Sequence, residues 1–329
     1  MSDAVVRHRD RDRLLLLGPG AIAAAAPHLE GADVLLTTPR ARAQLPAAAG
    51  WARTTVDVPA GRVDEVAAAL RERVVGRRLV ALGGGRVIDV AKALAAADPP
   101  RTVVAVPTTL SAAEMTGSHR QARGVAPGTP TVAASVVVVD PALSASQPPA
   151  ERAASSANAL GHALTALASD RSDPIAGAVA RDAVRTIAAA WRAGDPDPLP
   201  LATAAVQAGW ALDGVGLALH HAIAQEAVRQ AGAAHATANA AVLPGTVAAI
   251  RRRRPALVGE LDGLLGEPLE AVAERLRERA GAAVPALAEP AARERVAAAV
   301  LARGPQLERI GPPPDAAELD ALLLAAARR

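Results

Sequence analysis

The chain has 329 residues, 51% of them hydrophobic and 21% charged, and its formal net charge at pH 7 is +3. This length is too great for one small hydrophobic core, so the sequence predicts one large domain or two medium ones. Because cysteine is absent, a disulfide framework, thiolate metal sites and a cysteine nucleophile are excluded.

The charge and aromatic content argue against nucleic-acid and membrane partners. Basic residues are scattered apart from the run from Arg251 to Arg254, and only three tryptophans could stack on bases. The N-terminal segments RHRDRDR and LLLLGPGAIAAAAP imitate a signal peptide, but aspartates interrupt the basic part and a Gly-Pro-Gly turn ends the apolar run. No stretch of about 20 unbroken apolar residues could span a bilayer. We therefore expect a cytoplasmic protein that binds neither nucleic acid nor membrane.

The first half of the chain alternates between short apolar runs and amphipathic segments. The runs LLLL, DVLLTTP, RLVALGGG, TVVAVPTT and ASVVVVD predict strands, and residues 21–29, 62–73 and 87–97 predict helices. Buried strands that alternate with helices favour a parallel α/β sheet. After about Pro148, alanine-rich helical segments follow one another without a comparable strand pattern. We therefore predict an α/β domain over residues 1–150 and an all-helical domain over residues 151–329.

Glycines and hydroxyls stand where two of the predicted strands end. Gly83, Gly84 and Gly85 lie between a strand and a helix, and Thr108 and Thr109 follow the next strand. Glycine lets backbone amides approach a phosphate closely, and a helix N-terminus adds favourable partial charge. Glycine-rich turns often serve packing alone, but the strand–glycine–helix context favours a phosphate cradle. In an open α/β sheet, the carboxyl ends of the strands form the ligand crevice.

The helix that follows the glycines carries two charged residues. Asp89 falls in the first turn of the predicted helix, where a carboxylate can cap free amides or hold the glycine loop. Lys92 is the only lysine of the chain. A lysine is ordinarily a surface residue, but its rarity among so many arginines argues for a particular role here.

Several motifs resemble those of a known family. GGGRVIDVAK and VPTTLSAAEMT resemble the cofactor motifs of the iron-containing alcohol dehydrogenase superfamily, and AEMT with ANALGHALTAL is most similar to its maleylacetate reductase branch. The resemblance covers nearly the whole chain, from GPGAI to the last helix. It implies an N-terminal Rossmann-like parallel-sheet domain and a C-terminal all-helical domain, the fold shared with dehydroquinate synthase. It also implies a site in the cleft between the domains, and a homodimer.

The resemblance implies NAD or NADP as cofactor. The residues that would hold it are Gly83, Gly84, Gly85, Asp89, Thr108 and Thr109. The second strand ends in LLTTPRAR, where NAD-specific folds often place an acidic residue for the ribose hydroxyls. Thr37 stands at this strand end, no acid follows, and Arg40 and Arg42 are within reach of a 2′-phosphate. We therefore expect NADP to be accepted alongside NAD.

The resemblance also implies a cluster of histidines. Metal-binding members of the family hold the ion with one aspartate and three histidines, the aspartate four residues before the first histidine. Here Asn158 and His162 have that spacing, which puts both on one helix face. His221 and His235 have the fourteen-residue spacing of the other two. We expect His162, His221 and His235 to line one pocket at the nicotinamide end of the cofactor, with zinc or iron as a candidate metal.

The sequence departs from the family pattern at four of these positions. Asn158 replaces the acidic ligand and brings no charge to a divalent cation, although three neutral imidazoles can still hold zinc. Gln225 stands where the family usually has a further histidine suited to relaying protons, so we count it among the catalytic positions although glutamine cannot titrate. Ala113 replaces a serine and Thr165 a glutamate. These departures leave the presence of a metal open and suggest a substrate other than maleylacetate.

The sequence leaves several functions open. The leading interpretation is an NAD(P)-dependent dehydrogenase or reductase that interconverts a hydroxyl and a ketone on a small or carboxylate-bearing substrate, as a tailoring enzyme of specialised metabolism. One version oxidises a β-hydroxy acid, such as the C-terminal threonine of a peptide, with loss of carbon dioxide. A lyase like dehydroquinate synthase and a catalytically degenerate partner subunit are the alternatives. Cofactor binding and net turnover discriminate among them.

Overall fold

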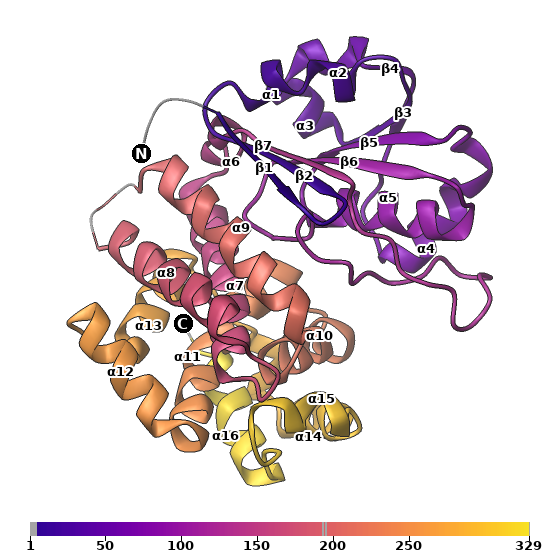
Figure 1. Ribbon diagram of the computed structural model, residues 1–329. Helices are drawn as coiled ribbons and strands as arrows, with labels where there is room; N and C mark the ends of the chain where they lie inside the picture. The colour runs from indigo at the N-terminus through magenta and orange to yellow at the C-terminus, as the bar shows by residue number, and fades with distance from the viewer. Residues whose placement is uncertain (1–4, 193, 195, 329) are drawn as a thin grey trace. The chain divides into compact units, whose positions relative to one another are not determined.

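The structure is a computed structural model that describes residues 5–192, 194 and 196–328. It consists of two compact units, Met1–Gln147 and Pro148–Arg329 (Figure 1). The sequence-based boundary was placed after residue 150. Among the described residues, no helix has the length and apolar character needed to cross a bilayer.

The first unit is built around a seven-stranded sheet with the order β1-β2-β7-β6-β5-β3-β4. The strands β1 and β2 pair antiparallel and the others pair in parallel. The strands are β1 (Val6–Asp10), β2 (Arg13–Leu17), β3 (Ala32–Thr37), β4 (Ala52–Asp57), β5 (Arg78–Gly83), β6 (Thr102–Pro107) and β7 (Val136–Val139). The helices are α1 (Ala21–Ala24), α2 (Ala26–Leu29), α3 (Pro39–Gln44), α4 (Val63–Leu70), α5 (Gly85–Ala97) and α6 (Pro141–Ala145), with 3₁₀ turns at Pro46–Gly50 and Arg71–Arg73.

Helices cover both faces of this sheet. One face packs against α1, α2 and α3 in a continuous apolar cluster, to which Leu35, Leu82 and Val106 belong (Figure 1). The opposite face carries α5, which contacts β5 and β6 and is itself covered by α4. The inner strands are buried on both faces, which is why they are continuous apolar runs in the sequence.

The register of the sheet brings the candidate phosphate residues together. Gly83 at the end of β5 pairs with Pro107 at the end of β6, and the Thr108 amide donates to the Gly83 carbonyl over 3.0 Å. The two segments that follow therefore leave the sheet side by side at the carboxyl edge. This is the edge at which open parallel sheets bind ligands.

Among its described residues, the second unit has helices as its only regular secondary structure. Its helices are α7 (Pro149–Ala168), α8 (Pro174–Ala190), α9 (Pro198–Val215), α10 (Leu219–Ala231), α11 (His235–Arg253), α12 (Pro255–Leu265), α13 (Leu269–Arg279), α14 (Pro290–Leu301), α15 (Gly304–Leu307) and α16 (Ala316–Ala326), with 3₁₀ turns at Pro285–Ala288 and Glu308–Ile310. The almost fully buried α7 contacts α8, α9, α11 and α13. Its alanines and glycine allow this close approach: a Cβ on Gly161 would lie 2.5 Å from the ring of His220 on α10.

Candidate functional site

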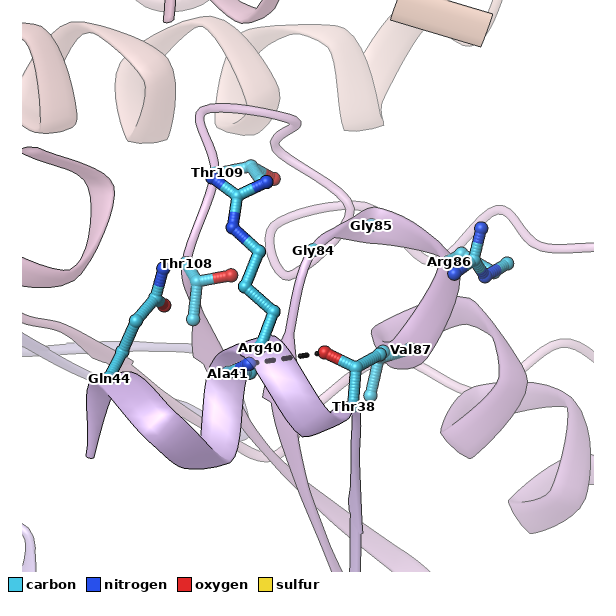
Figure 2. Close-up of a pocket in the computed structure, with 10 residues that line it drawn as sticks. All are labelled: Thr38, Arg40, Ala41, Gln44, Gly84, Gly85, Arg86, Val87, Thr108 and Thr109. Carbon is cyan, nitrogen blue, oxygen red and sulfur yellow. Dashed lines mark hydrogen bonds between the residues drawn. The ribbon is translucent and has the colours of Figure 1, made fainter. Parts of the chain in front are cut away.

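A pocket of about 290 Å³ opens in the first unit at the carboxyl edge of the sheet (Figure 2). Three segments form it: the start of α3, the turn from β5 into α5, and the residues after β6. The lining residues are Thr38, Arg40, Ala41, Gln44, Gly84, Gly85, Arg86, Val87, Thr108 and Thr109. Two arginines and no carboxylate occur among these residues, so the pocket favours an anionic ligand.

The glycines are required because other segments approach the turn closely. A Cβ on Gly83 would lie 2.6 Å from Cγ2 of Val87, and one on Gly84 would lie 3.1 Å from Cγ2 of Thr109. A Cβ on Gly85 would lie 2.9 Å from the hydroxyl of Ser111. The N-cap residue Gly84 offers no side-chain cap, so the first amides of the 13-residue helix α5 stay available to an anion.

The start of α3 forms the opposite side of the pocket. Thr38 caps this helix by accepting a hydrogen bond from the Ala41 amide over 3.2 Å. The side chain of Arg40 extends from α3 toward Thr109 (Figure 2). Arg42 instead forms an ion pair of 2.8 Å with Asp57. Of the two arginines that follow β3, Arg40 is therefore the one on the pocket.

Five of the eight predicted cofactor residues line this pocket, whereas Gly83, Thr37 and Asp89 do not. Thr37 is fully buried within β3, and Thr38 lines the pocket in its place. Asp89 lies outside the first turn because α5 begins at Gly85, two residues earlier than predicted, and its carboxylate pairs with Lys92 over 2.7 Å. Arg86, which the sequence analysis did not single out, joins the lining because the helix begins early.

A second candidate site in the helical unit is a cluster of buried histidines. His162 on α7 and His221 on α10 stack with ring centroids 4.6 Å apart and planes inclined by 15°. The ring of His220 meets that of His221 edge to face at 4.9 Å. All three side chains are buried. His162 and His221 are thus in direct ring contact, and His220 is the third member of this cluster.

Burial keeps these imidazoles neutral. Loss of solvation, together with the neighbouring histidines, lowers the pKa of His162 to about 3. Burial likewise lowers the pKa of His220 to about 4 and that of His221 well below its usual value. A neutral imidazole has one N–H donor and one bare nitrogen. At pH 7 the cluster can therefore both donate and accept hydrogen bonds.

A hydrogen-bonded chain fixes the tautomer of His220. The Thr246 hydroxyl donates to the Val242 carbonyl over 2.9 Å, so it accepts from Nδ1 of His220 at 3.2 Å. The proton of His220 therefore sits on Nδ1 and Nε2 is bare. In the described part of the chain, hydrogen-bond partners are absent from Nδ1 of His162 and from both ring nitrogens of His221.

The remaining predicted residues lie around this cluster. His235, at the start of α11, is exposed, and its coulombic interaction contributes to lowering the pKa of His162 and His221. Its carbonyl accepts from the Asn239 amide over 2.9 Å. Asn158 is buried on α7, one turn before His162. The predicted catalytic residue Gln225 accepts a hydrogen bond of 2.7 Å from Arg303. Its amide oxygen is thus already engaged in an ion-pair network.

Comparison with protein families identifies the helical unit. Residues 152–293 match the model of the Fe-containing alcohol dehydrogenase family, C-terminal. The match includes every candidate residue of the histidine cluster.

Curated relatives are maleylacetate reductases. Maleylacetate reductase 2 of Cupriavidus pinatubonensis is 32% identical over 225 residues, which make up 64% of this chain and 61% of that protein. Maleylacetate reductase 1 of Rhodococcus opacus is 32% identical over 175 residues, 50% of this chain and 49% of that protein. The chain therefore matches 61% and 49% of the length of these two relatives.

Solved structures show the same fold. The crystal structure of maleylacetate reductase from Agrobacterium tumefaciens has a TM-score of 0.80 at 23% identity, with 99% of this chain and 98% of that chain covered. An iron-containing alcohol dehydrogenase from Corynebacterium glutamicum has a TM-score of 0.81 at 20% identity, with 99% and 97% covered. The predicted resemblance and the predicted fold are confirmed.

The family uses NAD(P) and iron, which raises the question of whether the histidines present fit a metal. Over residues 5–192, 194 and 196–328, no group of three or more histidine, aspartate or glutamate side chains is arranged to hold an ion. The donor lone pairs of an imidazole lie in the ring plane, and the stacked rings of His162 and His221 do not aim theirs at one point. Asn158 offers only a neutral oxygen where a carboxylate would be. The donor set therefore does not fit a metal in this arrangement, and a zinc or iron site stays a prediction.

Proposed function

We propose that the chain is an NAD(P)-dependent oxidoreductase that interconverts a hydroxyl and a ketone. The observation that carries this proposal is the pocket of the first unit, where a glycine turn, a helix N-terminus, two threonine hydroxyls and Arg40 surround one cavity without a carboxylate. This combination suits the phosphates of a dinucleotide. The family of residues 152–293 and the curated maleylacetate reductases support the same class of reaction.

Each unit contributes a separate part of the chemistry. The amides that follow Gly84 and the hydroxyls of Thr108 and Thr109 bind and orient the pyrophosphate of the cofactor. When bound, the nicotinamide supplies or accepts the hydride. His162 and His221 are neutral at pH 7, so an imidazole N–H can donate to a ketone oxygen as negative charge develops on it. In the reverse direction, a bare ring nitrogen can accept the proton of the hydroxyl.

The substrate class follows from the relatives. We propose a small or carboxylate-bearing hydroxy or keto compound, since the similar reductases are named for maleylacetate. The departures at Asn158 and Gln225 favour a compound different from maleylacetate. Oxidation of a β-hydroxy acid with decarboxylation falls within the same reaction class. We also propose that the protein forms a homodimer, because its motifs resemble those of the iron-containing alcohol dehydrogenase superfamily.

The test combines binding with turnover. Titration of the purified protein with NADH and NADPH, followed by nicotinamide fluorescence, should give a Kd on the order of 1–100 µM, in the usual range for enzyme ligands. A panel of 2-keto, 3-keto and unsaturated keto acids should then contain a compound that oxidises the reduced cofactor. Binding without net oxidation of any compound would favour the lyase, and absence of binding would refute an oxidoreductase.

Arg40 tests the choice of cofactor. Because its guanidinium lies on the pocket, Arg40→Ala should raise the Kd of NADPH by about tenfold, the loss expected of one charge-assisted phosphate contact, and leave that of NADH nearly unchanged. Arg42→Ala is the matched control, since Arg42 follows the same strand but pairs with Asp57. Equal effects of Arg40→Ala on the two cofactors would show that Arg40 does not select the 2′-phosphate.

A further inference from the structure

The only lysine of the chain is fully buried in the first unit. The side chain of Lys92 on α5 has 0% relative exposure. Its ammonium donates to the carbonyls of Ala113 at 2.8 Å, Thr116 at 3.0 Å and Ser118 at 3.1 Å. The carboxylate of Asp89, one turn earlier on α5, lies 2.7 Å away. Lys92 is therefore not the surface residue that a lysine ordinarily is.

These contacts use every proton of the ammonium. A buried charge is costly unless it is paired and fully hydrogen-bonded, and an ammonium has three protons to donate. Four oxygen atoms surround Nζ of Lys92, three of them backbone carbonyls of one segment, residues 111–118. A lysine that served only solubility would lie at the surface. The buried ammonium with its four oxygen partners instead holds residues 111–118 against α5.

The segment so held continues directly from the wall of the pocket. Thr108 and Thr109 line the cavity, and the chain then runs through Ser111 and Ala113 across the glycine turn. An ideal Cβ on Gly85 would lie 2.9 Å from the Ser111 hydroxyl and 3.4 Å from Cβ of Ala113. The same residue, Ala113, gives its carbonyl to Lys92. A displacement of the segment would therefore reach the phosphate-binding turn through direct contacts.

The backbone of the segment is itself strained. Ala112 has a φ of 60°, in the left-handed region that residues other than glycine rarely occupy. Such a conformation persists where the surroundings hold it in place. Two hydrogen bonds supply that restraint. Lys92 donates to the carbonyl of Ala113, the residue after Ala112, and Arg13 donates to the Met115 carbonyl over 2.7 Å.

We propose that Lys92 is a positioning residue of the dinucleotide pocket, which fastens residues 111–118 to α5 and thereby sets Thr108 and Thr109 against the glycine turn. This inference rests on the proposed function of the pocket. Lys92 itself contacts no ligand, because its ammonium is enclosed by the four oxygens of the chain. Its effect on the cofactor is carried by the segment.

The first experiment compares two variants of α5 at a temperature at which both are folded. Lys92→Met keeps the length of the side chain without the ammonium, leaves three carbonyls unsatisfied, and should raise the Kd of NADPH by about tenfold or more. Leu94→Ala, at a fully buried position two residues further along, should lower the unfolding temperature without changing that Kd. A folded Lys92→Met protein whose Kd is within twofold of the wild-type value would overturn the proposal.

A second measurement needs no variant and covers the case in which Lys92→Met does not fold. Hydrogen exchange of the wild-type protein should slow at the amides of residues 111–118 when NADPH binds, together with those of the glycine turn. Protection of the glycine turn alone would overturn the role of Lys92. If the wild-type protein binds neither NADPH nor NADH, the proposed function fails, and the role of Lys92 fails with it. If the wild-type protein binds NADPH but the Lys92 results differ from expectation, only the role of Lys92 fails.

Discussion

Two buried polar side chains, Lys92 in the first unit and His221 in the helical unit, have opposite surroundings. In the first unit, the ammonium of Lys92 has four oxygen partners within hydrogen-bond distance. In the helical unit, His221 is equally buried, yet neither of its ring nitrogens has a hydrogen-bond partner among the described residues. Native proteins leave few buried polar atoms unsatisfied, because each one costs stability. A satisfied group is explained by the fold, whereas an unsatisfied cluster points to function.

A second contrast concerns the ionisation of buried groups in the two units. Burial raises the pKa of Glu114, which lies in the segment held by Lys92, to about 7. Burial lowers the pKa of His162 and His220 to about 3 and about 4. In both cases the charged form is disfavoured. Because an acid is neutral at low pH and a base at high pH, the contributions of Glu114 and of these histidines to stability should depend on pH with opposite signs.

The largest effect is expected at the glycine turn. Gly84→Val places a branched side chain into contact with Thr109 and into the cavity, so the Kd of NADPH should rise by at least about a hundredfold. Gly84 has a φ of −75°, which any residue adopts, so the fold should survive. Gly50→Val, where a Cβ meets nothing within 4 Å, is the control. Unchanged NADH and NADPH affinity in Gly84→Val would remove the cofactor from this pocket.

The histidine cluster should show a smaller effect, on turnover alone. In His221→Leu an apolar side chain of similar size replaces a ring with two unsatisfied nitrogens, so the unfolding temperature should hold or rise. Turnover should fall by about a hundredfold, the usual contribution of a general acid–base group, with cofactor affinity unchanged. His28→Leu on α2 is the comparison, for which we expect normal turnover. Full activity with reduced stability would show that His221 has a structural role only.

The smallest effect is the pH dependence of stability. The folded pKa of Glu114 lies above its unfolded value of 4.5, so its stabilising contribution is complete below pH 4.5 and is lost as pH rises through about 7. Glu114→Gln should therefore gain stability relative to wild type between pH 5 and pH 8, on the order of 2 kcal/mol. The low pKa of His220 gives the reverse sign, with stability complete above pH 6.5 and lost as pH falls toward 4.

Denaturant unfolding at pH 5, 6, 7 and 8 measures this difference. Glu72→Gln replaces an exposed carboxylate of the same unit and serves as the control. A Glu114→Gln protein whose stability runs parallel to that of wild type across this range would show that Glu114 is ionised in the folded state throughout.

How much of the fold the sequence predicts depends on burial. The strands β2, β3, β5, β6 and β7 are inner strands with apolar runs, and each was predicted. The edge strands β1 and β4 were missed, because VRHRD is almost wholly exposed and ARTTVD buries one residue of six. An edge strand is defined by its neighbour's hydrogen bonds, which leave no hydrophobic pattern in its own sequence.

The sequence pointed to Gly84, Gly85, His162 and His221, but not to the exposed position of His235 or to the part of His220 in the cluster. The strand–glycine–helix order located the pocket, yet the helix begins two residues earlier than its apolar pattern indicates, which moves Asp89 away and brings Arg86 in. The burial of Lys92 depends on a loop whose carbonyls converge on it, and backbone carbonyls carry no sequence signal. The chain from His220 to Thr246 likewise depends on the packing of α10 against α11.

The most direct test of the central claim is a crystal structure of the protein with NADPH. We predict the pyrophosphate on the amides that follow Gly84, with a hydroxyl of Thr108 or Thr109 in contact and the 2′-phosphate within hydrogen-bond distance of Arg40. The carbonyls of Ala113, Thr116 and Ser118 should remain on Lys92. Electron density for the dinucleotide at another place, or an ordered dinucleotide whose phosphates avoid the glycine turn, would contradict the account.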